Sequence, residues 1–236
     1  MDIIMIPGLW LDGSSWDEVV PHLERAGHRT YPLTLPGMES QSADRSAISL
    51  RDHVDAVVQV IDSISLSDRN VVLVAHSAGC AIAHAAVDAR PERVARGVYV
   101  GGFPIGDGGT IAAGFPADGP DVPMPDWSEF DEEDLVDLDG EARATFRERA
   151  IPSPAGVANG RQRLFDERRY DVPVTAIATE YTTEMLRSWI AEGVESVREF
   201  SKIREVEYID LPTGHWPQFT RPRELAQVIL AGVQRV

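Results

Sequence analysis

Six short segments rich in Val, Ile and Tyr alternate along the chain with segments of helical periodicity. The apolar segments, each bounded by Gly or Pro, cover residues 3–6, 29–35, 71–75, 97–100, 172–178 and 205–211. The helical periods cover residues 16–23, 50–61, 78–89 and 222–233. Because strands and helices alternate, we expect parallel strands joined by right-handed crossovers, with helices on both faces. The sequence therefore predicts an α/β fold with a mostly parallel, six-stranded, doubly wound sheet.

Two of the expected helices carry recognisable start signals. Ser15 is followed by Glu18 three residues later, and Ser49 is followed by Asp52, so each pair fits a capping box. Gly27 is expected to end the first of these helices, since glycine readily adopts the left-handed conformation found after a helix.

One segment interrupts the alternation. Between Phe103 and Gly140 the chain has eleven acidic residues and no Lys or Arg, and several prolines favour a loop in its first half. After this first half, as far as about Tyr170, we expect short amphipathic helices, with Arg-rich faces after Glu141. Because an insertion after a strand lies over the ligand crevice of an α/β sheet, residues 103–170 are predicted to form a lid within a single domain spanning residues 1–236. The alternative is an acidic, solvated surface loop.

Composition narrows the range of partners. The single cysteine, Cys80, can form neither an internal disulfide nor a cysteine-based zinc site, and we expect no metal. A net charge of −16 opposes binding to nucleic acid and to anionic bilayers. No run of 18 apolar residues and no basic N-terminal region are present, which indicates a cytoplasmic protein without a membrane partner. The oligomeric state is left open.

The strongest local motif is an apolar strand, a sharp turn and a helix of small residues over positions 71–83. Ser77 lies at the tip, with Ala75 two residues before it and Gly79 two residues after it. A serine exposed on such a strained turn needs small neighbours at these positions. The motif predicts a nucleophile elbow of the pattern G-x-S-x-G, in which Ala75 replaces the first glycine. The plainer interpretation is a strand-to-helix turn with a capping serine.

Two further loops supply the groups that a nucleophilic serine needs. The turn after the first strand, residues 7–16, places the Leu9 amide beside that of Ala78, and two such N–H donors would stabilise a tetrahedral oxyanion. His215 lies between the last strand and the last helix, at the same edge of the sheet as Ser77, and is the candidate general base.

The other histidines and several aromatic residues are assigned less specific roles. His76 flanks the nucleophile and is a candidate pocket residue. We expect surface positions for His22, His28 and His53, and a place behind the elbow for His84. Candidate aromatic pocket walls are Trp10, Phe103, Phe115, Trp127 and Trp216.

Together these motifs resemble the α/β-hydrolase superfamily over nearly the whole chain. The resemblance rests on the turn at residues 7–10, where many members have His-Gly, on the elbow at residues 75–79, on the insertion, and on residues 214–216 before the final helix. Residues 16–28 look like the compact branch that contains plant methylesterases and hydroxynitrile lyases. The resemblance implies the chain order serine, acid, histidine, and a fold that lacks the first two strands of the full sheet.

The acid departs from the family pattern. Members usually carry Asp in a turn after the strand that corresponds to residues 172–178, but this chain has Glu180 there and no aspartate. The extra methylene would let Glu180 reach His215. Asp107 is the alternative, since some lipases carry their acid after the preceding strand. We favour Glu180 because a histidine is oriented by a fixed carboxylate and Asp107 lies in a glycine-rich segment. Otherwise Glu180 would simply be a glutamate at a helix N-terminus.

The resemblance implies a cofactor-free serine hydrolase that cleaves a small carboxylic ester through an acyl-enzyme. Because of the acidic segment, we expect a neutral substrate to be accepted more readily than an anionic one. The alternatives are a lyase or a cofactor-free oxygenase that uses the same site, and a small-molecule binding protein with slow turnover.

Overall fold

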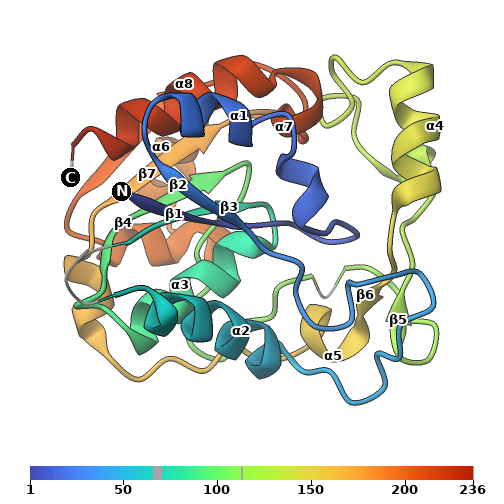
Figure 1. Ribbon diagram of the computed structural model, residues 1–236, viewed down its shortest axis with the longest axis horizontal. Helices are drawn as coiled ribbons and strands as arrows, with labels where there is room; N and C mark the ends of the chain where they lie inside the picture. Colours follow the sequence, from blue (N-terminus) through green and yellow to red (C-terminus); the bar gives the residue numbers. More distant parts are fainter. Residues whose placement is uncertain (66–70, 113, 236) are drawn as a thin grey trace.

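The computed structural model describes residues 1–65, 71–112 and 114–235. Its centre is a six-stranded sheet in which every neighbouring pair of strands is parallel (Figure 1). In the order in which they lie across the sheet, the strands are β2 (Arg29–Pro32), β1 (Asp2–Ile6), β3 (Val71–His76), β4 (Val94–Val100), β7 (Val174–Ala178) and β8 (Val206–Asp210). The predicted strands and the predicted sheet are confirmed.

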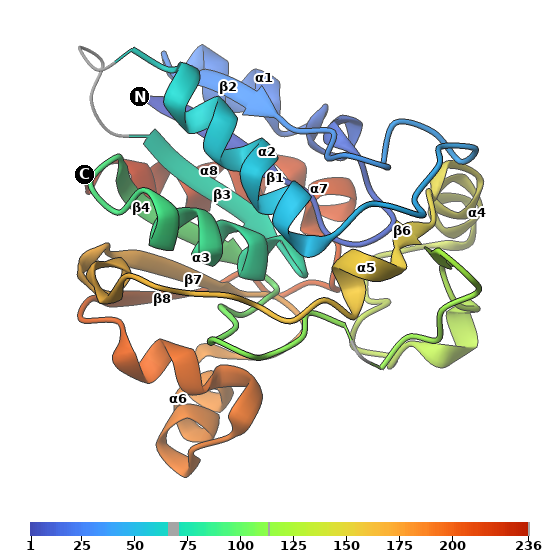
Figure 2. The same ribbon diagram turned by 90° about the horizontal axis from the view of Figure 1, so that it is seen from below.

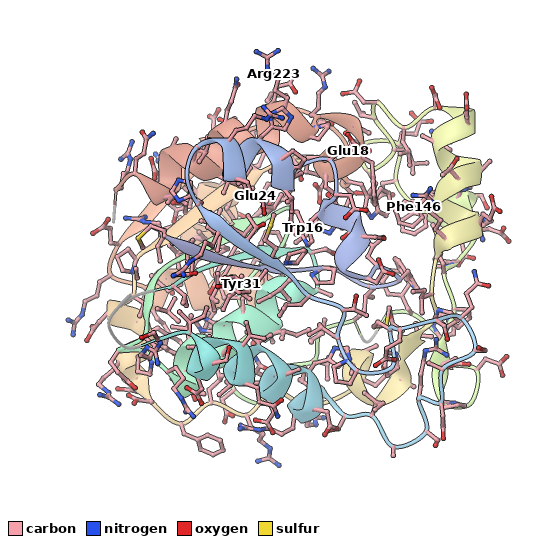
Figure 3. The ribbon with its side chains drawn as sticks, in the orientation of Figure 1. Trp16, Glu18, Glu24, Tyr31, Phe146 and Arg223 are labelled. Atoms are coloured by element: carbon pink, nitrogen blue, oxygen red, sulfur yellow. The ribbon has the colours of Figure 1, made fainter. Side chains whose placement is uncertain are left out.

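The central strands are apolar along their whole length because helices cover both faces of the sheet. Every residue of β1, β3 and β7 is buried, as expected for a parallel sheet with two covered faces. On one face lie α2 (Leu50–Ser63), α3 (Gly79–Ala89) and α6 (Thr183–Glu192), and on the other lie α1 (Val20–Arg25) and α8 (Pro222–Val233) (Figures 1 and 2). Two hydrophobic clusters result, one on each side. Figure 3 shows Trp16 inside the molecule, whereas Arg223 points away from it.

One of the two predicted capping boxes is confirmed and the other is wrong. Ser49 caps α2 together with Asp52. The first helix does not begin at Ser15: residues 13–16 form a 3-10 helix, η1 (Gly13–Trp16), and α1 begins only at Val20. The Asp12 side chain causes this difference, because it accepts a hydrogen bond from the backbone N–H of residue 14 at 2.9 Å and so starts the turn earlier than the predicted cap.

The segment at residues 103–170 combines loops with short elements. These are β5 (Asp121–Val122) paired with β6 (Ser153–Pro154), η3 (Trp127–Glu129), α4 (Gly140–Arg149), α5 (Ala155–Ala158) and η4 (Glu167–Asp171). Helix α4 lies beyond the end of the sheet toward which the strands run (Figure 2). Leu138 and Phe146 attach this part of the chain by packing against Leu11 and Trp216. The remaining elements are η5 (Glu195–Lys202) and α7 (Pro217–Thr220). Within the described ranges, no helix is both long and apolar enough to cross a membrane.

Candidate active site

The turn between β3 and α3 forces Ser77 into a conformation that few non-glycine residues adopt. Its φ is 52°, and its backbone N–H donates to the Val100 carbonyl oxygen at 2.9 Å. Close backbone packing explains the small neighbours. A Cβ atom on Gly79 would lie 2.6 Å from the Pro7 carbonyl oxygen, and one on Gly102 would lie 2.4 Å from the Ser77 carbonyl oxygen. The hydrogen bond to Val100 and the close backbone contacts therefore hold the turn in its strained conformation. Backbone strain persists in a folded protein when the surrounding structure fixes it in this way.

Three side chains meet at the carboxyl ends of three strands. Ser77 Oγ lies 2.8 Å from His215 Nε2, and His215 Nδ1 lies 2.8 Å from Glu180 Oε1. Ser77 follows β3, Glu180 follows β7 and His215 follows β8, so the parallel sheet brings them to one edge. Asp107 lies elsewhere: its side chain is exposed and accepts a hydrogen bond from the Leu164 backbone N–H at 3.0 Å. Of the two candidate acids, the one in contact with the histidine is Glu180.

The charges around His215 favour its protonated form. Burial by itself would lower the pKa of the imidazole, but the charge and hydrogen bond of Glu180 and the charge of Asp134 outweigh it and raise the pKa. For Glu180, burial acts to raise the pKa, and the charge and hydrogen bond of His215 overcome it and lower the pKa. The Thr179 hydroxyl also donates to Glu180 Oε2. The pair therefore behaves as a carboxylate that holds an imidazole ready to accept a proton.

His76 contacts the loop that carries His215. Burial, followed by the nearby His215, lowers the pKa of His76 to about 3, so its imidazole is neutral at ordinary pH. Its Nε2–H donates to the His215 carbonyl oxygen at 2.7 Å. The Trp216 ring lies edge-on to the His215 ring, with centroids 5.0 Å apart. His76 and Trp216, two of the predicted pocket residues, are almost fully buried, and their contacts hold the loop that carries His215.

The residues that carry the two predicted oxyanion donors share one small cavity. Leu9 and Ala78 line the same small cavity, whose volume is about 20 Å³ and whose other walls are mainly apolar. The turn that carries Leu9 is fixed through its neighbour Trp10, which has a φ of 63°. The Trp10 backbone N–H donates to Ser153 Oγ at 2.8 Å, and its indole N–H donates to the Val122 carbonyl oxygen at 3.1 Å.

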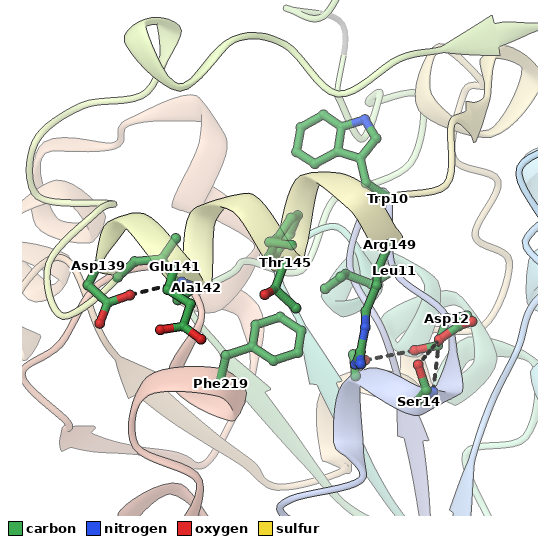
Figure 4. A pocket seen from close by; sticks show the side chains of 13 residues that line it. Trp10, Leu11, Asp12, Ser14, Asp139, Glu141, Ala142, Thr145, Arg149 and Phe219 are labelled. Carbon is green, nitrogen blue, oxygen red and sulfur yellow. Dashed lines mark hydrogen bonds between the residues drawn. The ribbon is translucent and has the colours of Figure 1, made fainter.

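Two of the remaining aromatic candidates, Trp10 and Phe103, line larger cavities. Trp10 lines a cavity of about 730 Å³ between α4 and residues 11–15, in which Phe219 of α7 lies opposite α4 (Figure 4). Phe115 packs edge-on against Trp10, and Trp127 packs against Trp216. Neither Ser77 nor His215 lines this large cavity, so its size does not make it the reaction site. Phe103 instead lines a cavity of about 510 Å³ that contains Glu180.

Two residues with roles at the site were not recognised from sequence. His53 was expected at the surface, and that prediction is wrong: the side chain is 3% exposed, donates from Nε2 to the Pro36 carbonyl oxygen at 2.8 Å and lines the small cavity beside Leu9. Its position between Leu50 and Val54, on the apolar face of α2, was the available signal. The other is Asp134, which was counted only as one acid among eleven.

Asp134, Glu180 and His215 are also the group of described residues that could hold a metal ion. Each offers one ligand atom, and these atoms lie within 4.8 Å of one another. Both ring nitrogens of His215 are already engaged, one by Ser77 and the other by Glu180. A metal ion would therefore have to break one of these hydrogen bonds.

Comparison with known proteins identifies the family. The sequence model described as "Alpha/beta hydrolase family" matches residues 3–228, and the chain belongs to this family. Methylesterase 7 of Arabidopsis thaliana is 31% identical over 102 residues, which are 42% of this chain and 39% of that protein. The matched stretch thus spans about two fifths of the curated relative.

Solved structures agree on the fold. An extracellular alpha/beta-hydrolase from a Paenibacillus species, described as sharing structural and functional homology with tobacco salicylic acid binding protein 2, superposes with a TM-score of 0.76 at 20% identity and covers 98% of both chains. A pyrethroid hydrolase from Sphingobium faniae JZ-2 superposes with a TM-score of 0.71 at 22% identity, covering 99% of this chain and 97% of the other.

Proposed function

We propose that this α/β hydrolase is a serine esterase that cleaves a small carboxylic ester through an acyl-enzyme. The observation that carries the proposal is the continuous hydrogen-bonded chain from Ser77 through His215 to Glu180 on a strained elbow. The likeness to a methylesterase supports an ester as the substrate. Nucleophile, base and orienting acid in this arrangement are what acyl transfer requires.

In the proposed mechanism His215 Nε2 removes the proton from Ser77 Oγ as that oxygen attacks the ester carbonyl carbon. The backbone N–H groups of Leu9 and Ala78 stabilise the resulting oxyanion, and Glu180 stabilises the imidazolium. His215 then gives its proton to the departing alcohol, which leaves an acyl group on Ser77. A water molecule, deprotonated by the same histidine, attacks the acyl carbon, and collapse of the second intermediate releases the carboxylic acid and restores Ser77.

We further propose that residues 103–170 act as a lid within a single domain that spans the chain. The packing of Leu138 and Phe146 on Trp216, which adjoins His215, supports this role because it brings the segment to the site. The eleven acids of the segment support a preference for neutral over anionic esters. We also propose a cytoplasmic location, a compartment in which the buried thiol of Cys80 would stay reduced.

A fluorophosphonate label combined with a panel of p-nitrophenyl esters tests the proposal. We expect covalent labelling and turnover in the wild type, and neither in Ser77→Ala, whose elbow packs no large side chain. Ser42→Ala removes an exposed serine and is the matched control. Labelling without turnover would favour the lyase or binding alternative, and turnover near wild type in Ser77→Ala would refute the mechanism.

A further inference from the structure

Asp134 reaches the histidine loop from the proposed lid. Its backbone carbonyl oxygen accepts a hydrogen bond from the His215 backbone N–H at 2.8 Å. The neighbouring Gly214 is in close contact with the backbone of the same segment. A Cβ atom on Gly214 would lie 2.4 Å from the Asp134 carbonyl oxygen and 2.5 Å from that of Val136. The lid backbone and the loop that carries His215 are therefore packed directly on one another.

The Asp134 carboxylate lies near both Glu180 and His215. One oxygen from each carboxylate and one ring nitrogen of His215 lie within 4.8 Å of one another, and both carboxylates line the 510 Å³ cavity. Among the described residues no Lys or Arg forms an ion pair with Asp134. Asp137 differs in this respect, because its carboxylate is 2.8 Å from the Arg221 guanidinium.

Two carboxylates this close repel one another unless a positive charge lies between them or beside them. Burial, with contributions from Glu180 and Asp131, raises the pKa of Asp134, while the charge of His215 lowers it. Two further described residues that hydrogen-bond with His215 carry no charge: Ser77 is neutral, and His76 is neutral because of its burial. The histidine is therefore the cation that can relieve the repulsion.

We propose that Asp134 is a positioning residue for His215, acting beside Glu180 as a second carboxylate that favours the imidazolium over the neutral imidazole. The inference rests on the proposed function, in which His215 becomes charged as Ser77 attacks. An interaction that strengthens at that moment lowers the barrier, whereas the neutral resting state gains nothing from it. Because Asp134 belongs to the lid, the basicity of His215 depends on the lid being seated.

Asp134→Asn tests the role of the carboxylate, since the substitution leaves the backbone contact to His215 in place. We expect kcat/KM on its plateau to fall about tenfold, and the acidic limb of its pH profile to move to lower pH by about one unit, as loss of an opposite charge at this range implies. Asp134→Glu should keep the limb near its wild-type position. Glu132→Gln removes a charge from an exposed neighbour in the same segment and should leave both quantities unchanged.

The imidazole pKa itself is measured by NMR titration of ¹⁵N-labelled histidine, with His215→Ala used to assign the signal. This measurement needs no turnover, so it judges Asp134 even if fluorophosphonate labelling refutes the proposed esterase. A fall in the His215 pKa in Asp134→Asn, and none in Glu132→Gln, supports the proposal. An unchanged pKa in Asp134→Asn overturns it, and equal shifts in both variants overturn it in favour of a general field of the acidic segment.

Discussion

Replacing Glu180 with glutamine tests the acid that departs from the family pattern. The substitution keeps the shape of the side chain but removes the charge that faces His215 Nδ1 at 2.8 Å. An opposite charge at such a distance shifts a pKa by about 1 to 3 units, so the imidazolium formed during attack loses much of its stabilisation. An amide N–H facing Nδ1 would also favour the tautomer with its proton on Nε2, which cannot accept the Ser77 proton.

The two effects together are expected to lower kcat by about 10³ to 10⁴, as amide replacement of the acid does in serine protease triads. That loss corresponds to about 4 to 5.5 kcal/mol of transition-state stabilisation. Turnover of a neutral p-nitrophenyl ester, followed over a range of pH, gives both the loss and its cause. Because the pKa of His215 is raised in the wild type, the acidic limb should move to lower pH in Glu180→Gln.

Two control variants make the result specific. Glu184→Gln removes an exposed charge four residues further on, and Asp107→Asn removes the charge of the other candidate acid; both should cost little. A severe loss in Asp107→Asn with an active Glu180→Gln would transfer the role of the acid to the earlier strand. If all three variants stay active, neither Glu180 nor Asp107 is an acid that His215 needs, and the protein is better explained as a slow hydrolase or a binding protein.

Three further outcomes follow from other contacts. Gly214→Ala should lower turnover at least tenfold with the fold retained, because its Cβ atom would meet the backbone of Asp134 and Val136, whereas Gly140→Ala, with open space around it, should be neutral in the same assay. Glu199→Gln should cost about 2 to 4 kcal/mol in urea unfolding at pH 7, because Glu199 is buried against His84, Tyr170 and Lys202. Since the folded-state pKa of Glu199 is lowered, its contribution is present above the unfolded-state pKa and lost as the pH falls, so the variant should differ less from wild type in acid. The preference for a neutral ester over its carboxylate-bearing analogue should shrink as salt is added; a constant ratio would mean that residues 103–140 act away from the site.

The sheet could be predicted because its strands are buried on both faces and so consist of continuous apolar runs. Pro222 at the start of the last helix and Ser49 at the start of α2 are local signals, and both helices begin where the sequence indicates. Local signals failed where a second local feature outweighed the first. Ser15 does not cap a helix because Asp12 starts the turn first, and His53 is buried because it shares the apolar face of α2, although histidine is a polar residue type.

Some residues of the candidate site could likewise be predicted from the sequence, and one could not. Ser77 and His215 are adjacent because strands of a parallel sheet end at one edge, which alternation along the chain already implies. Glu180 was recognised by its place after the strand, although only the structure shows its contact with Nδ1. Asp134 could not be found, because it belongs to a run of acids with no periodicity, and only the folded segment shows which of them faces the histidine.

The order of strands also bears on when the chain becomes active during refolding. Ser77 and His215 are 138 residues apart in sequence, and His215 follows β8, an edge strand of the sheet, which pairs with β7. Contacts of such long range form slowly, since a large loop must close before they are made. We expect recovery of ester turnover to lag behind recovery of far-UV circular dichroism in a refolding experiment. A chain emerging from the ribosome would by the same reasoning carry its serine long before it carries a base to activate it.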